Sequence, residues 1–383
     1  MKILFVQKEG GIFGAENYQL KVIPGLMAHG IEVEFLRLYT DYQGGKGGAF
    51  IDRLHDMHVK TFEVNIGKWP TPKVLRQIKN IANQGNYDVV HTHLIHADFH
   101  FALIKTFMQL KPILVSTKHG YDNNFTSRFG FDASKQKNTP YFLISRWAEK
   151  RMKASFTISH GLRNFFIATG LTQSTKMRLI HYGFDLPDHA KSKGQEKFRY
   201  APKQLMIAGR LVGFKGHRYL IEAMSQLKER FGNDVKLLIA GTGELEQELK
   251  EQVTQFDLHE NIDFLGYSTD VGALMANSDV VVVPSVSEGF GVVFLEAFAA
   301  KTPVVAWDVP AGNELMEHGQ TGYLVAPYEV DALAQQLIDI LENPNHQNPI
   351  VKAAHERLKS YFNLDRMVGE TIRFYEEALM GRG

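Results

Sequence analysis

The sequence predicts an α/β protein made of two Rossmann-like domains. Its 383 residues exceed what one ordinary hydrophobic core holds. Short β-branched runs alternate with helix-forming segments on both sides of a charged stretch, 186–204, that is poor in aliphatic residues. In addition, Val280–Trp307 has the pattern of a complete strand–helix–strand unit. We therefore expect a first domain over 1–185 and a second over 186–362.

The first domain opens with a predicted strand, Lys2–Gln7, a glycine-rich turn and a helix, Ala15–His29. The turn contains Gly10, Gly11 and Gly14, whose backbone N–H groups can cradle a phosphate at the helix N-terminus. Many α/β proteins need such a turn only for close packing, and the spacing is not Gly-x-Gly-x-x-Gly. The turn by itself therefore does not decide between the two roles.

The rest of the first domain continues the alternation. Strands are predicted at Ile31–Leu38, Asp88–Thr92, Ile113–Thr117 and Phe156–Ser159, helices at Val74–Asn83 and Leu162–Thr169, and a loop at Tyr39–Gly48. Two of these strands are followed at their carboxyl ends by histidines, His93 and His119. Open α/β sheets bind ligands at that edge, but a lone histidine is more often structural than catalytic.

The second domain repeats this order. Strands are predicted at Leu205–Ala208, Lys236–Ala240, Val280–Pro284 and Val304–Trp307, with another ending at Phe264–Tyr267. Helices are predicted at Tyr219–Arg230, Val292–Ala300, Asp331–Glu342, Ala353–Tyr361 and Leu364–Met380.

The loop Ser285–Gly291 carries the most informative residues of this domain. Glu288 in the loop stands eight residues before Glu296 in the helix that follows, and Phe290 lies between two glycines. Backbone N–H groups at a glycine-rich helix N-terminus suit a phosphate, and a carboxylate accepts hydrogen bonds from vicinal hydroxyls. The loop therefore predicts a nucleotide-sugar site, against the alternative of two solvated surface acids.

Two cations follow another strand of the same predicted sheet. Arg210 and Lys215 come after Leu205–Ala208, so they face the same sheet edge as Glu288. An arginine fork and a lysine point charge together suit a diphosphate, whereas the alternative is a pair of surface cations.

The composition excludes several classes of protein. The chain has no cysteine, so it has no disulfide framework, no thiolate nucleophile and no cysteine-based metal site. Its first residues, MKILFVQKEGG, fit a strand and not a signal peptide, and no run of apolar residues is long enough to span a membrane. We expect a cytoplasmic protein that binds no nucleic acid.

The net charge of +1 hides an imbalance between the two halves. Up to Asp185 there are 24 Lys and Arg against 14 Asp and Glu, a net +10, and the remainder has 19 against 28, a net −9. Within the basic half, Ser127–Lys153 mixes cations with Phe129, Phe131, Tyr141, Phe142 and Trp147. This composition suits an anionic membrane surface, so we expect peripheral binding to the inner face of a membrane; a solvated basic face is the alternative.

Part of the second domain resembles the donor site of the retaining glycosyltransferases of family 4, of the bacterial polysaccharide and glycoconjugate type. The matching residues are Pro284-Ser285-x-x-Glu288-Gly289-Phe290-Gly291-x4-Glu296-Ala297, Gly312-x-Glu314 and Gly319-x-x-Gly322-x-Leu324-Val325. The resemblance extends over most of the chain, most strongly in the second domain. It implies the GT-B fold, two Rossmann-like domains facing across a cleft, with a terminal helix, 363–383, that crosses back onto the first domain.

The resemblance also implies roles for single residues. It assigns the transferred sugar to Glu288 and His119, the nucleotide ribose to Glu296, and the diphosphate to Arg210 and Lys215. The implied catalytic residues are thus His119, Arg210, Lys215 and Glu288. The implied donor-binding residues are Gly11, Gly14, Arg210, Lys215, Gly266, Tyr267, Glu288, Gly289, Phe290, Gly291, Val292 and Glu296, and Glu16 and His93 are candidates for the acceptor. Which of Gly11 and Gly14 meets the phosphate stays open.

These residues imply transfer of a hexose from a nucleoside diphosphate sugar to an acceptor hydroxyl, with retention of configuration, in polysaccharide or lipid-linked glycan synthesis. Family frequency favours UDP-glucose. The chain contains no Asp-x-Asp, so we expect no metal and no other cofactor. A sugar-nucleotide epimerase or hydrolase of the same fold, or a non-catalytic nucleotide-sugar-binding protein, are the alternatives.

Overall fold

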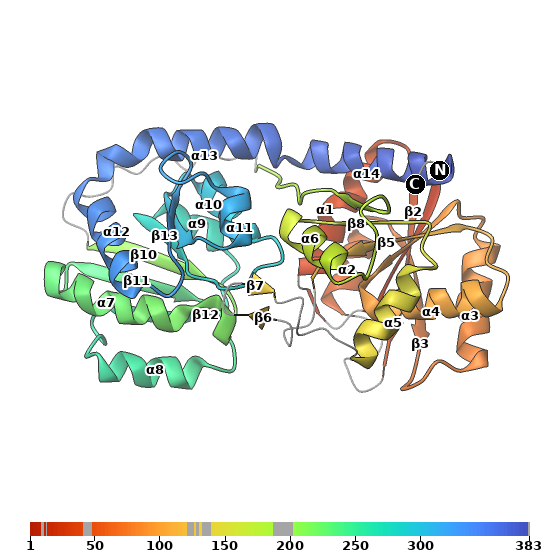
Figure 1. Ribbon diagram of the computed structural model, residues 1–383, viewed down its shortest axis with the longest axis horizontal. Helices are drawn as coiled ribbons and strands as arrows, with labels where there is room; N and C mark the ends of the chain where they lie inside the picture. The colour runs from red at the N-terminus through yellow and green to blue at the C-terminus, as the bar shows by residue number, and fades with distance from the viewer. Residues whose placement is uncertain are drawn as a thin grey trace. The chain divides into compact units, whose positions relative to one another are not determined.

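The structure is a computed structural model that describes residues 1–8, 11–12, 14–40, 48–120, 126–127, 130–131, 139–186 and 202–381. It divides into two compact units (Figure 1). Unit 1 comprises Met1–Phe125, Asp132–Gly183 and Leu364–Gly383, and unit 2 comprises Thr126–Phe131 and Phe184–Asn363. Gly10, most of the predicted loop and of the charged stretch, and much of the basic segment before α5 lie outside the described residues.

Unit 1 contains a parallel sheet of seven strands in the order β3-β2-β1-β4-β5-β8-β9. The strands are β1 (Lys2–Lys8), β2 (Glu32–Tyr39), β3 (Lys60–Asn65), β4 (Val89–His93), β5 (Ile113–Lys118), β8 (Ala154–Thr157) and β9 (Met177–Leu179). The chain builds outward in one direction from β1 and in the other from β4, so the order reverses between these two strands. Such a switch point opens a crevice at the carboxyl edge of a sheet.

Helices cover both faces of this sheet. One layer holds α1 (Gly14–Ala28), α2 (Ala49–Asp56) and α14 (Leu364–Leu379), and the other holds α3 (Pro72–Gln84), α4 (Leu94–Phe107) and α5 (Pro140–Glu149). The helix α6 (His160–Ala168) packs on β8 and β9. A Cβ on Gly25 would lie 2.4 Å from Val368 Cγ2, so glycine permits the close contact of α1 with α14.

Unit 2 contains a parallel sheet of six strands in the order β12-β11-β10-β13-β14-β15. They are β10 (Lys203–Ala208), β11 (Val235–Ala240), β12 (Ile262–Gly266), β13 (Val280–Val283), β14 (Val304–Trp307) and β15 (Tyr323–Val325). The short antiparallel pair β6 (Thr126–Ser127) and β7 (Gly130–Phe131) is grouped with this unit. Here the order reverses between β10 and β13, the two strands that precede the predicted cations and the predicted glutamates.

Two layers of helices enclose this second sheet (Figure 1). One layer holds α7 (His217–Phe231), α8 (Glu246–Gln255) and α12 (Val330–Glu342), and the other holds α9 (Val271–Ala276), α10 (Val292–Ala300) and α13 (Asn348–Tyr361). The helix α11 (Pro310–Leu315) follows β14. Between the sheet and the α7 layer lies a core of buried aliphatic side chains, which also contains Trp307.

The predicted strands and long helices are confirmed, and α10 and β14 match their predicted ranges residue for residue. The units divide after Gly183 and after Asn363, and α14 is part of unit 1. Eleven helices and strands in the described part of the chain were not predicted. They are α2, β3, α4, β6, β7, α5, β9, α8, α9, α11 and β15.

Candidate functional site

The carboxyl edge of the unit 2 sheet holds the predicted donor residues at its switch point. From β10 the chain enters a short 3₁₀ turn, Gly213–Lys215, and then α7, and from β13 it enters the Ser285–Gly291 loop and then α10. The Val286 N–H donates to Phe214 O at 2.9 Å, so a backbone hydrogen bond joins the two connections. Residues distant in sequence are thereby held together at one edge of the sheet.

Both helices that start here have a glycine as N-cap and no side-chain hydrogen bond at that cap. Gly216 (φ 76°) and Gly291 (φ 94°) are in the left-handed region, and a Cβ on Gly216 would lie 1.9 Å from Pro284 O. Two helix N-termini at neighbouring strand ends present N–H donors and partial positive charge, which suits a diphosphate. The sequence indicated the one at α10, and the one at α7 was missed although Lys215-Gly216 precedes a helical pattern.

Lys215 and Glu288 form an ion pair between these two connections. Lys215 Nζ lies 2.5 Å from Glu288 Oε1, and their side chains are 19% and 11% exposed. The sequence did not predict this pair, because the partners are 73 residues apart. In this arrangement the carboxylate holds the lysine ammonium between the two connections.

The other predicted donor residues of unit 2 lie along the same edge. Arg210 is exposed after β10, and Glu296 is half-buried on α10. Gly266 ends β12, and its carbonyl accepts from Gly241 N–H at 2.8 Å. Tyr267 follows it and is 81% exposed, a ring available for stacking on a base. Val292 begins α10, half-buried Gly289 and buried Phe290 precede it, and the ring of Phe290 packs on Phe362.

In unit 1 the predicted histidines form a pair at the carboxyl edge. His93 Nδ1 and His119 Nε2 share a hydrogen bond of 2.8 Å, with stacked rings whose centroids are 5.1 Å apart. His93 is fully buried and also stacks on Phe5, so a direct contact of His93 with an acceptor stays a prediction. Leu94, directly after β4, has φ 66°, an unusual value for leucine that lets the strand turn straight into α4.

A buried charge cluster next to these histidines was not predicted. Lys118 pairs with Asp98 and with Glu149, which are 2% and 1% exposed. Burial opposes the charge of Lys118, but the two carboxylates raise the pKa of this lysine above its ordinary value. Burial, together with the charge of Lys118, lowers the pKa of His119 to about 3. His119 is therefore neutral at physiological pH, and a neutral imidazole can both donate and accept a hydrogen bond.

The remaining predicted residues of unit 1 lie near the first turn. Gly11 is half-buried, and Gly14 is exposed at the start of α1, where a Cβ would meet no atom within 4 Å. Glu16 is 3% exposed and accepts a hydrogen bond from Gln7, which in turn accepts from Gln19. Contact of these residues with a ligand stays a prediction.

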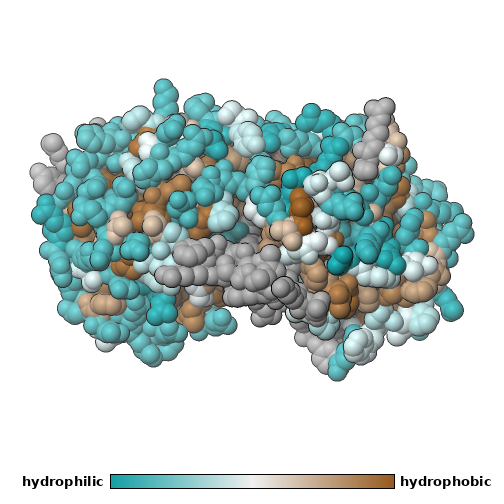
Figure 2. All heavy atoms as spheres, in the orientation of Figure 1, coloured by the Kyte–Doolittle hydropathy of each residue, from teal (hydrophilic) through white to brown (hydrophobic). Residues whose placement is uncertain are grey.

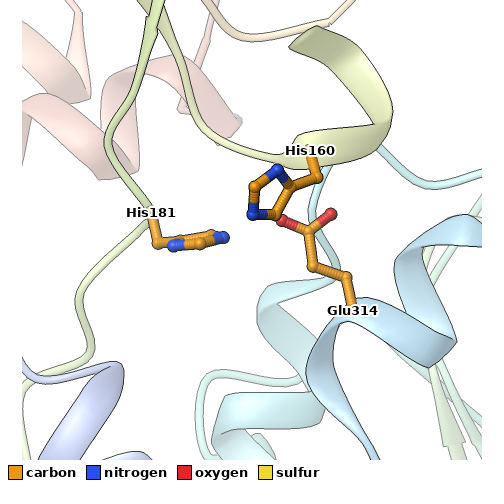
Figure 3. A group of neighbouring side chains, drawn as sticks. All are labelled: His160, His181 and Glu314. Carbon is orange, nitrogen blue, oxygen red and sulfur yellow. The ribbon is translucent and has the colours of Figure 1, made fainter. Parts of the chain in front are cut away.

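Two further histidines lie at this edge of unit 1. His160 begins α6, and His181 follows β9, with ring centroids 5.5 Å apart (Figure 3). Glu314 of the Gly312-x-Glu314 motif lies on α11 in unit 2, also drawn in Figure 3. The sequence did not predict a role for this histidine pair.

Comparisons with known proteins identify the family. The family profile described as Glycosyltransferase Family 4 matches residues 12–187, and the one described as Glycosyl transferases group 1 matches residues 188–357. A phosphatidyl-myo-inositol mannosyltransferase of Mycolicibacterium smegmatis is 37% identical over 310 residues, covering 80% of this chain and 75% of that protein. The chain belongs to the family 4 glycosyltransferases.

Other similar proteins support the assignment of this chain to the glycosyltransferases. An uncharacterized glycosyltransferase of Methanocaldococcus jannaschii is 30% identical over 315 residues, 77% of each chain. The Anabaena protein HepE, solved in complex with UDP, superimposes with a TM-score of 0.80 at 22% identity, covering 98% of this chain and all of that one. That likeness shows the GT-B fold. Among the described residues of the glycosyltransferase, no helix is long and apolar enough to cross a bilayer.

Because His119 is neutral in the folded protein, the stability of the glycosyltransferase should depend on pH. The pKa of His119 is about 3 in the folded protein and about 6.5 in an unfolded chain. Below pH 6.5 the unfolded chain therefore binds a proton that the folded one does not, and the free energy of unfolding falls by up to about 1.4 kcal/mol per pH unit for this histidine.

Urea unfolding between pH 7 and pH 5 measures this effect. His119→Gln should give a shallower dependence than wild type, whereas His58→Asn, at an exposed position, should not change it. Equal slopes for wild type and His119→Gln would contradict a buried neutral His119.

Proposed function

We propose that this glycosyltransferase moves a hexose from a UDP-sugar to an acceptor hydroxyl, with retention and without a metal. The observation that supports the donor most is the Lys215–Glu288 pair between the N-termini of α7 and α10. Lysine, arginine and helix N-termini match a diphosphate, and the two glutamates match hydroxyls of a sugar and a ribose. A structure of HepE contains UDP-glucose, which favours that donor.

In the proposed reaction, the bond between the anomeric carbon and the diphosphate oxygen breaks as the acceptor oxygen bonds to the same face of that carbon. The acceptor proton passes to the departing diphosphate oxygen. Arg210, Lys215 and the helix N-termini stabilise the charge that develops on the diphosphate, which is the largest contribution expected in such a site. Glu288 and the neutral His119 orient the sugar by hydrogen bonds.

For the acceptor we propose a lipid-linked glycan or polysaccharide precursor. The Mycolicibacterium relative is named for a lipid acceptor, phosphatidyl-myo-inositol. The first half of the chain carries an excess of cations, which would attract an anionic lipid-linked substrate.

A panel of sugar nucleotides tests the donor. A ligand that binds only the folded protein raises its unfolding temperature, so UDP-glucose should raise it more than ADP- or GDP-sugars do. Incubation of the favoured donor with an acceptor should release UDP and form a conjugate. Release of the free sugar alone would support a hydrolase, an epimer would support an epimerase, and a thermal shift without any product would support a binding protein.

Turnover should also survive EDTA. Two cationic side chains and two helix N-termini can neutralise the leaving diphosphate without a metal ion. The rate of UDP release before and after chelation measures this, with magnesium and manganese added back. Complete loss on chelation that either metal restores would contradict a metal-independent site.

A further inference from the structure

One face of unit 1 exposes large apolar side chains where a surface helix normally exposes polar ones. The helix α5 buries Phe142, Ser145 and Ala148, and α5 packs against α4. On its outward side Tyr141, Leu143 and Ile144 are 40%, 52% and 36% exposed, and Phe107, the last residue of α4, is 74% exposed. Figure 2 shows hydrophobic side chains over these two helices.

The exposed charges on this face are all positive. Over Leu94–Phe107 and Thr139–Lys153 the exposed charged side chains are Lys105, Arg146, Lys150 and Lys153. The acids of the same two segments, Asp98 and Glu149, are buried in ion pairs with Lys118. The two negative charges therefore face inward, and the exposed charges on the two helices that carry the apolar side chains, and on the residues that follow α5, are cationic.

We propose that this surface, the α4–α5 face, docks on an anionic lipid bilayer. We define it as Phe107, Tyr141, Leu143 and Ile144 with Lys105, Arg146, Lys150 and Lys153. Apolar side chains that enter the acyl boundary, with lysines and arginines at the depth of the headgroups, are the features by which helices lie in a membrane interface. Each lysine near such a surface strengthens binding about fivefold, and salt weakens the effect.

Half-buried Arg151 supports the helix end that presents these cations. Its guanidinium stacks on the Trp147 ring at 4.2 Å and donates to Thr106 Oγ1 and Trp147 O, both at 3.1 Å. These contacts tie the end of α5 to the end of α4. We therefore leave Arg151 unchanged in the test and reverse the charges of Lys150 and Lys153.

The test is cosedimentation of the full chain with vesicles of phosphatidylcholine, with and without phosphatidylglycerol, at low and high salt. Wild type should bind only the anionic vesicles and lose binding as salt rises. Lys150→Glu with Lys153→Glu should weaken binding at least tenfold. Leu143→Asn with Ile144→Asn should weaken binding even at low salt, because the apolar contribution is lost.

The matched control reverses the same number of charges elsewhere. Lys352→Glu with Lys359→Glu, both exposed on α13 in unit 2, changes the net charge equally and should bind like wild type. Circular dichroism and the thermal shift with UDP show whether each variant is folded. No vesicle carries donor or acceptor, so the result is independent of the proposed reaction.

Three results would overturn the docking proposal. One is an absence of binding to anionic vesicles at low salt, and another is equal weakening by the α13 control. The third is self-association of the wild-type chain, in the absence of vesicle binding, that Leu143→Asn with Ile144→Asn abolishes. In that case a second copy of the chain would cover the face.

Discussion

Lys215→Ala should lower kcat/KM for the sugar donor by about 30- to 1,000-fold, with Arg210→Ala causing a loss of similar size. A charge-assisted contact to the developing diphosphate contributes about 2–4 kcal/mol to transition-state stabilisation. Lys215 is held at the site by Glu288, whereas Arg210 is exposed beside it. The matched control is Lys250→Ala, which removes a lysine in a surface ion pair with Glu246 on α8.

The loss from Lys215→Ala has a second possible cause, because it leaves Glu288 without its lysine. The double variant Lys215→Ala with Glu288→Gln removes that unpaired charge. Recovery of activity in the double variant would attribute the loss to the unpaired carboxylate. Our account predicts no recovery, since neither the cation nor the sugar-binding carboxylate is then present. Single variants within a factor of two of wild type would remove Arg210 and Lys215 from the site.

Glu296→Gln should weaken binding of the nucleotide, whereas Glu288→Gln should slow the reaction. Glu296→Gln replaces the charged acceptor proposed for the ribose diol, so binding of free UDP should weaken about 10- to 100-fold. Glu288→Gln should leave UDP binding unchanged or slightly tighter, because Lys215 is released toward the phosphates, while kcat falls by about two orders of magnitude.

Calorimetry with free UDP and initial rates with the UDP-sugar measure the two effects separately. Glu251→Gln, at an exposed position of α8, is the control for replacing one surface acid by an amide. Equal UDP affinity in the Glu288 and Glu296 variants would show that the proposed division between ribose and sugar is wrong.

The parts of the fold that could be predicted are those whose signal is local. Val304–Trp307 is a short apolar run directly after a proline, and Val292–Ala300 is a dense apolar segment directly after a glycine, so both ranges were predicted. The strand β15 has three residues, and α4 begins at Leu94 without a loop or a side-chain cap. In such elements the neighbouring strands and helices supply the stabilisation, and a short window of sequence does not contain it.

In the candidate site, too, only the features with a local sequence signal could be predicted. Glu288, Arg210 and Lys215 could be placed at one edge because parallel strands bring their carboxyl ends together. The ion pair of Lys215 with Glu288, the hydrogen bond between His93 and His119 and the pairs of Lys118 with Asp98 and Glu149 join residues from different parts of the chain. Sequence spacing does not encode such contacts, so the neutral state of His119 could be inferred only from the folded structure.

Hydrogen–deuterium exchange with and without UDP tests the central claim most directly, namely that the donor binds where β10 and β13 diverge in unit 2. Our account predicts slower exchange of backbone amides in Gly209–Gly216, Gly266–Tyr267 and Ser285–Glu296, because the phosphates, base and ribose cover these segments. The exchange rates of amides in the α8 helix, whose residues are not part of the site, should be the same with and without UDP. Binding of UDP by calorimetry without protection of Gly209–Gly216 and Ser285–Glu296 would contradict the account.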